Sequence, residues 1–145
     1  MPEQETLERA REDAREGKSP STQAGEFVRE EIHHVREGKH GAKSAKQVIA
    51  IGLSKARRAG VKLATPKGKA STRKKAAQDT RAAKKRTSKK SVARSRATTN
   101  ALKREPRSAA SHQAVSRQAK TAAAQRGKQS RKKAAMKAAQ TRKAA

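Results

Sequence analysis

Short clusters of lysine and arginine are the residues of this sequence whose type and spacing are best suited to chemistry. Each cluster places two or three cations within one turn of a helix, which matches the dense phosphate charge of a nucleic-acid duplex. We therefore expect backbone phosphates to be the ligand. The clusters consist of Arg73, Lys74, Lys75, Lys84, Lys85, Arg86, Lys89, Lys90, Lys103, Arg104, Arg131, Lys132 and Lys133.

A second basic region surrounds an expected helix that begins after Ser44. Backbone N–H groups at a helix N-terminus, together with nearby lysines, suit a phosphate; the alternative is an ordinary loop between two helices. Cations at the other end of this helix either complement its dipole or make a second phosphate contact. The residues are Lys39, Lys43 and Lys46 at the start and Lys55, Arg57, Arg58 and Lys62 at the end.

Catalytic and metal-binding chemistry find little support in the sequence. There is no cysteine, and no serine lies in a nucleophile motif. The adjacent histidines His33 and His34 point about 100° apart on a helix, so they cannot easily share one ion. We expect no enzyme activity, no metal and no cofactor.

Charge divides the chain into three predicted segments. Residues 1–37 carry ten acidic and six basic groups, residues 38–63 carry seven basic groups, and residues 64–145 carry 26 basic groups against Asp79 and Glu105. A like-charged block of this size is typical of an interaction tail. The predicted domains are an acidic helix and linker at 1–20, a helical hairpin at 21–63 and a Lys/Arg/Ala-rich tail at 64–145.

The predicted fold is mostly α. Periodicity indicates helices over residues 3–16, from Ser21 or Thr22 to about residue 37, and from Ser44 to Gly60. Ser44 and Gln47 form a capping box, and Gly52 would permit close approach of the two hairpin helices. The hairpin has few large apolar residues, so we expect it to be stabilised by homodimerisation, by nucleic acid or by the first helix.

The basic tail is expected to be disordered in isolation. It has no aromatic residue and almost no large aliphatic residue, which is the composition of a disordered segment. Its many alanine, lysine and arginine residues favour helix once phosphate neutralises their repulsion. The sequence therefore predicts a long tail that is disordered or conditionally helical.

Residues 31–60 resemble a small family of uncharacterised basic bacterial proteins, some labelled as plasmid-stabilisation proteins. The likeness rests on the motif KHGAKSAKQVIAIGLSKARRAG, which starts at Lys39. The tail is similar in composition to bacterial histone H1-like proteins. These resemblances imply a bacterial, DNA-condensing protein.

The leading hypothesis is sequence-nonspecific DNA binding through the phosphate backbone by a nucleoid- or plasmid-associated protein. The alternatives are an RNA- or ribosome-associated protein, and a protein–protein module that the basic tail only localises. No zinc-finger, KH or basic-zipper pattern is present in the sequence. No apolar run is long enough to span a membrane, and the acidic N-terminus does not resemble a secretory signal. We expect a cytoplasmic protein on the nucleoid.

Overall fold

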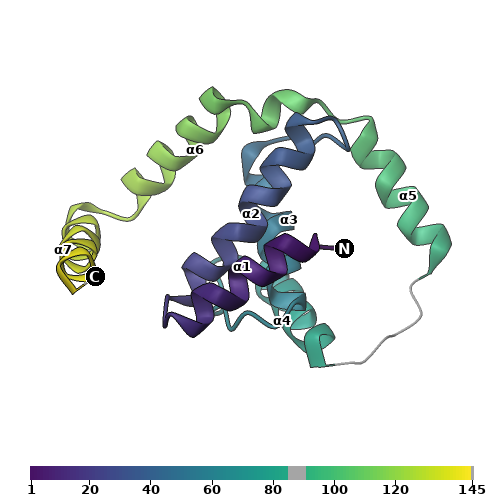
Figure 1. Ribbon diagram of the computed structural model, residues 1–145. Coiled ribbons are helices and arrows are strands. Elements are labelled where there is room, and N and C mark those ends of the chain that lie inside the picture. Colours follow the sequence, from purple (N-terminus) through teal and green to yellow (C-terminus); the bar gives the residue numbers. More distant parts are fainter. Residues whose placement is uncertain (85–90, 145) are drawn as a thin grey trace. The chain divides into compact units, whose positions relative to one another are not determined.

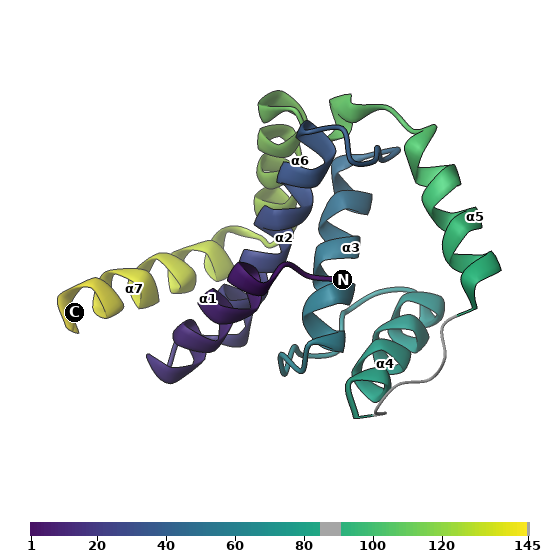
Figure 2. The same ribbon diagram turned by 45° about the vertical axis from the view of Figure 1, so that its right-hand side comes forward.

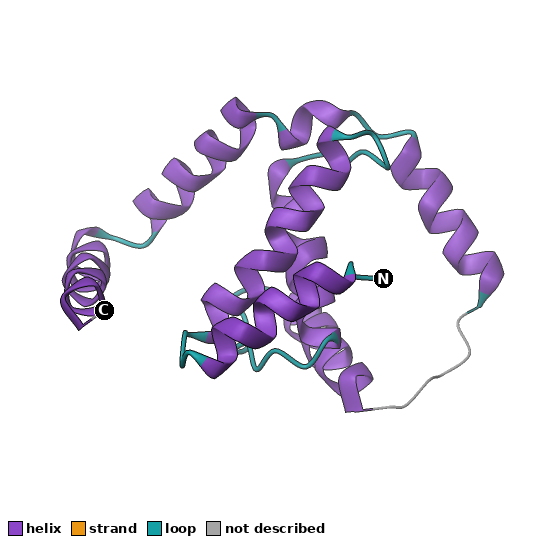
Figure 3. Ribbon diagram, in the orientation of Figure 1, coloured by secondary structure: helices purple, strands orange, loops and turns teal. Residues whose placement is uncertain are grey.

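The computed structural model describes residues 1–84 and 91–144, and in this part of the chain every regular element is a helix (Figure 3). The chain divides into two compact units, Met1–Ser111 and His112–Ala145. The predicted boundaries at residues 20 and 63 follow charge and stay a prediction. The structural division falls elsewhere, after Ser111.

Helices α1 (Gln4–Arg15) and α2 (Pro20–Arg36) open the first unit. The sequence predicted a cap at Ser21 or Thr22, but Ser19 is the N-cap. Its side chain accepts a hydrogen bond from the Thr22 N–H at 3.3 Å. Pro20 then occupies the first helical position, where its fixed φ suits a helix and its missing N–H costs nothing.

Helix α3 (Ala45–Arg58) has the predicted capping residues. Ser44 accepts a hydrogen bond from the Gln47 N–H at 3.3 Å, and the Gln47 side chain accepts one from the Lys43 N–H at 2.8 Å. At the other end, Gly60 has a φ of 99° and Val61 donates to the Ala56 carbonyl at 3.1 Å. Both features confirm that local sequence sets the bounds of this helix.

Helices α2 and α3 lie side by side as the predicted hairpin (Figures 1 and 2). Gly52 lies at a close approach of the two backbones, since a Cβ at this position would lie 2.7 Å from the Val28 Cα. Helix α1 covers one end of the pair, where Leu7 and Ala10 pack with Phe27 and Ala56. The first helix thus supplies apolar cover that the hairpin lacks by itself.

The prediction of a disordered tail is wrong. The described residues after position 64 form helices α4 (Ala70–Lys84), α5 (Val92–Lys103), α6 (His112–Gln125) and α7 (Lys128–Ala144), with a 3₁₀ turn, η1 (Arg107–Ala110). The prediction counted only large apolar side chains. Several buried contacts of the tail are instead made by alanine, at Ala76, Ala109 and Ala110.

Helix α4 packs against α3 and buries one apolar and one acidic residue. Ala76 is buried, and Asp79 is buried one turn later. The Asp79 carboxylate accepts hydrogen bonds from Ser54 at 2.7 Å and from Arg58 at 2.8 Å, both on α3. An acidic residue of the tail therefore joins it to the hairpin.

A second part of the tail, residues 102–110, closes over the loop between α2 and α3; we call it the clasp. The Gly41 N–H donates to the Leu102 carbonyl at 2.8 Å, and the Ala42 N–H donates to the Pro106 carbonyl at 3.1 Å. Ala109 and Ala110 of η1 complete an apolar cluster with Val35, Ala42 and Val48. The apolar end of the hairpin is thus covered by the chain's own tail.

The second unit contains α6 and α7. None of its described residues is buried, and its apolar content is mostly alanine. High helix propensity is therefore the physical reason for these two helices, since packing contributes little.

We predict that Gly52→Ala destabilises the hairpin although alanine favours a helix. The new Cβ would collide with backbone atoms of α2, which cannot move as a flexible side chain does. We expect an overpacking cost of about 1–3 kcal/mol, measured as the free energy of unfolding in urea.

Gly25→Ala is the matched control for this experiment. Gly25 also lies within a helix, but nothing lies within 4 Å of a Cβ there. It should therefore gain the helix-propensity term of about 0.5–1 kcal/mol without a clash. Equal stabilities of the two variants would show that the close approach at Gly52 carries no constraint.

Candidate nucleic-acid interface

The predicted phosphate ligands that the structure describes fall into two groups: those that form ion pairs with acidic side chains and those that form no ion pair with a described residue. This distinction matters because a cation already paired with a carboxylate gains less from a phosphate. The paired group consists of Lys39, Lys43, Lys55, Arg58 and Lys75.

Lys39 is held by two carboxylates. Its Nζ lies 3.0 Å from Glu3 Oε1 and 3.2 Å from Glu37 Oε2. A hydrogen bond from His34, which has the larger effect, and one from Lys39 lower the pKa of Glu3 to about 2. Glu3 is therefore ionised at neutral pH. The same carboxylates raise the pKa of Lys39. Its charge is balanced within the protein.

Lys55 belongs to the interior of the hairpin. Its Nζ lies 2.6 Å from Glu31 Oε2 and 3.1 Å from Glu30 Oε1, and both carboxylates are buried. Burial by itself would lower the pKa of Lys55, but Glu31 and Glu30 outweigh it and raise the pKa. This lysine compensates buried charge.

Arg58 and Lys75 share Asp79. Their nitrogens lie 2.8 Å and 3.1 Å from Asp79 Oδ1. Burial would raise the pKa of Asp79, but hydrogen bonds from Ser54, Arg58 and Lys75 outweigh it and lower the pKa. Arg58 therefore fixes α4 on α3 through Asp79, whereas Lys75 lies on α4 itself and pairs with Asp79 within that helix.

The loop before α3 has little free capacity for the predicted phosphate. The N–H groups of Gly41 and Ala42 donate to carbonyls of the clasp, and the Lys43 N–H donates to the Gln47 side chain. The Lys43 ammonium lies 3.8 Å from Glu105. Only Lys46, on the first turn of α3, is exposed without an ion pair in this region of the described structure.

The remaining predicted ligands make no ion pair within residues 1–84 and 91–144. Apart from the half-buried Arg57, they are exposed. They are Lys46, Arg57, Lys62, Arg73, Lys74, Lys84, Lys103, Arg104, Arg131, Lys132 and Lys133. Four further predicted ligands, Lys85, Arg86, Lys89 and Lys90, lie outside the described residues.

The sequence interpretation overlooked most cations of the second unit. Residues 112–145 contain ten basic residues and no acidic one, and each of the ten is exposed. Seven of them lie outside the predicted clusters because they occur singly or in one pair. They are Arg117, Lys120, Arg126, Lys128, Lys137, Arg142 and Lys143.

Helical geometry gathers many of these cations onto one face of α7. At about 100° per residue, five of them fall within an arc of roughly 120°. Such a stripe can follow one strand of a phosphate backbone. The five are Lys128, Arg131, Lys132, Arg142 and Lys143.

One cluster of the first unit could hold an ion. One oxygen of Glu31 and one ring nitrogen each of His34 and His40 lie within 4.8 Å of one another. In the sequence His34 is adjacent to His33, a pair that cannot easily share one ion. The structure leaves His33 exposed and brings His34 to His40, which sequence spacing could not reveal because the loop conformation determines it.

Comparison of the chain with family models, with curated proteins and with solved structures gives no match. The resemblances to a basic bacterial family and to histone H1-like proteins therefore rest on the sequence motif and on composition. Among the residues that the structure describes, no helix has the length and apolarity needed to cross a membrane.

We predict that Asp79→Asn weakens the attachment of α4 to α3. Asparagine carries no negative charge, so the hydrogen bonds from two cations become weaker. We expect the free energy of unfolding to fall by about 1–3 kcal/mol. The folded-state pKa of Asp79 lies below its ordinary value of 3.8, so its contribution is present above that value and is lost as the pH falls further. Urea unfolding of both proteins from pH 7 to pH 2 measures this.

The difference in stability between wild type and Asp79→Asn should be constant near neutral pH and shrink below about pH 4. Glu8→Gln, which removes an exposed carboxylate of α1 that makes no ion pair in the described structure, is the control. A difference that stays unchanged down to pH 2 would contradict the assigned role of the Asp79 charge.

Proposed function

We propose that the protein binds double-stranded DNA without sequence preference, through contacts between its basic helices and backbone phosphates. The observation that carries this proposal is the second unit, His112–Ala145, where ten exposed cations occur with no acidic residue. No acidic side chain of this unit is available to neutralise these cations. A polyanion supplies the neutralising charge.

The chemistry of the exposed side chains favours the backbone over the bases. The only aromatic residue of the chain is Phe27, and it is buried in the first unit. Base stacking by aromatic side chains is the usual means of binding single-stranded nucleic acid. Without it, release of condensed counterions from a duplex is the main source of affinity.

The structure alters which residues we assign to this function. Cations in ion pairs hold the first unit together, so the phosphate contacts are assigned to the unpaired ones. In the first unit these include Arg73 and Lys74 on α4 and Lys103 on α5. A nucleoid- or plasmid-associated role is the setting in which such nonspecific binding is expected.

We predict that binding depends steeply on salt. With ~8–10 phosphate contacts, the slope of log K against log salt is about −7 to −9. The double substitution Lys132→Gln and Lys133→Gln should make this slope less steep by about 1–2, because glutamine keeps helix propensity and removes two contacts. Fluorescence anisotropy with a labelled duplex measures it.

Arg9→Gln with Lys18→Gln is the matched control, since it removes the same charge from cations that already pair with acidic residues. It should leave the slope within about 0.5 of the wild-type value. An equal change in both double variants would mean that total charge, and no particular surface, determines binding. Tighter binding to structured RNA at matched salt would assign the protein to RNA.

A further inference from the structure

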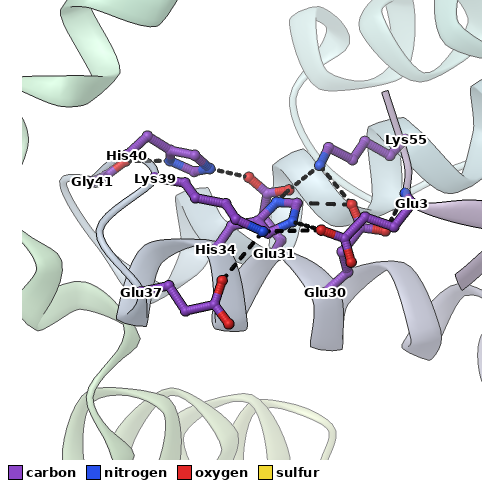
Figure 4. Close-up of polar contacts among 9 residues, drawn as sticks. All are labelled: Glu3, Glu30, Glu31, His34, Glu37, Lys39, His40, Gly41 and Lys55. Carbon is purple, nitrogen blue, oxygen red and sulfur yellow. Dashed lines mark hydrogen bonds and ion pairs between the residues drawn. The ribbon is translucent and has the colours of Figure 1, made fainter. Parts of the chain in front are cut away.

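The carboxylate of Glu31 lies inside the hairpin, surrounded by nitrogen atoms (Figure 4). His40 Nε2 lies 2.7 Å from Oε1, and His34 Nδ1 lies 4.0 Å from Oε2. The side chain of Glu31 is only 1% exposed. Two imidazole rings, one from α2 and one from the loop that follows it, thus face one buried carboxylate.

The hydrogen bonding of His40 fixes which of its nitrogens is free. Its Nδ1 lies 3.0 Å from the Gly41 carbonyl oxygen, which can only accept, so Nδ1 carries the hydrogen. In the neutral ring, Nε2 is then an unprotonated acceptor that faces the Glu31 oxygen. Two acceptors at this distance need a cation between them, either a proton or a metal ion.

His34 is arranged in the same way by a different partner. Its Nε2 lies 2.9 Å from Oε1 of the Glu3 carboxylate, an acceptor, so Nε2 carries the hydrogen and donates it. The free nitrogen is Nδ1, which faces inward, 3.8 Å from Glu30 Oε1. Metal-binding histidines are typically oriented like this, with the second ring nitrogen donating to a carboxylate or a backbone carbonyl.

The local charge also suits a divalent ion. In the described structure the carboxylates of Glu3, Glu30, Glu31 and Glu37 form ion pairs with two lysine side chains, those of Lys39 and Lys55. With neutral imidazoles, four negative and two positive charges leave two negative charges. This local excess of acid occurs in a chain of net charge +27.

We propose that Glu31, His34 and His40 bind a divalent transition-metal ion of the zinc type. Imidazole nitrogen with one carboxylate oxygen suits zinc, nickel or copper and disfavours magnesium and calcium, which prefer oxygen ligands. Glu3 and the Gly41 carbonyl orient the two rings. This proposal is independent of nucleic-acid binding.

The ligand atoms are close to the spacing that zinc requires. Ligands bound tetrahedrally at 2.0–2.1 Å lie about 3.3 Å apart. Here the Glu31–His40 separation is 2.7 Å and no separation in the set exceeds 4.8 Å, so small side-chain rotations suffice. A groove of about 220 Å³ between α1 and α2 is lined by Glu3, Glu30 and one of the three ligands, His34.

Isothermal titration of the tag-free, chelator-treated full chain with zinc chloride tests the proposal. We expect one ion per chain, with no comparable binding of magnesium. Binding should be at least tenfold weaker in Glu31→Gln and His40→Gln, which lack a ligand. It should be about tenfold or more weaker in Glu3→Gln, which loses only an orienting group.

His33→Gln is the matched control, since it removes the exposed neighbour of His34 on the same helix. Its affinity should stay within about twofold of wild type. Glu3 is half exposed, so Glu3→Gln tests the site even if a buried variant fails to fold, as judged by circular dichroism.

Histidine-labelled wild-type protein provides a measurement that needs no variant. Of the four histidines, one equivalent of zinc should shift the ring resonances of His34 and His40 and leave His33 and His112 unchanged. Absence of any shift at one equivalent, equal shifts in all four rings, or an unchanged affinity in both Glu3→Gln and His40→Gln would overturn the proposal.

Discussion

The first unit depends on the compensation of two adjacent buried carboxylates, Glu30 and Glu31 of α2. Removing such charges from water is costly unless each finds a cation or a hydrogen-bond donor. Glu30 accepts a hydrogen bond from the backbone N–H of Glu3, just before α1. Lys55 of α3 lies against both carboxylates. His40 of the loop between α2 and α3 lies against Glu31. One polar requirement thus brings together α1, α2, α3 and the loop, in a unit whose apolar core is small.

The same principle explains how a strongly basic tail joins this core. The tail has only two acidic residues, and both lie at points of attachment: Asp79 holds α4 on α3, and Glu105 lies in the clasp near Lys43. Attachment through ion pairs requires little apolar surface. Alanine side chains are therefore enough for the tail to pack on the core. The cations that remain unpaired lie mostly on helices with little or no buried surface, which separates the residues that stabilise the fold from those assigned to DNA.

Local features of the fold were predictable, and long-range ones were not. Ser44, Gln47 and Gly60 specify α3 through caps that depend on near neighbours, and the small size of Gly52 predicted a close approach to α2 that is confirmed. The tail was mispredicted because composition rules treat alanine as too small to form a core, although Ala109 and Ala110 are buried against Val35 and Val48. Asp79 and Glu105 are the only acidic residues of a basic segment. Their isolation in the sequence indicated that each contacts the hairpin, and the sequence interpretation overlooked this. The pairing of His34 with His40 depends on loop conformation, so no spacing rule reveals it.

The clasp has a consequence for the order in which the chain folds. Contacts between α2 and α3 join residues close in sequence, whereas Arg36 reaches the Ala110 carbonyl across 74 residues at 2.8 Å. Closing a loop of that length is slow relative to forming a local helical hairpin. During synthesis the hairpin therefore emerges and folds while its apolar end, around Val35 and Val48, still lacks its cover. The nascent protein passes through a stage in which that end is exposed to solvent and to other chains. This stage ends when residues 102–110 leave the ribosome and cover that end.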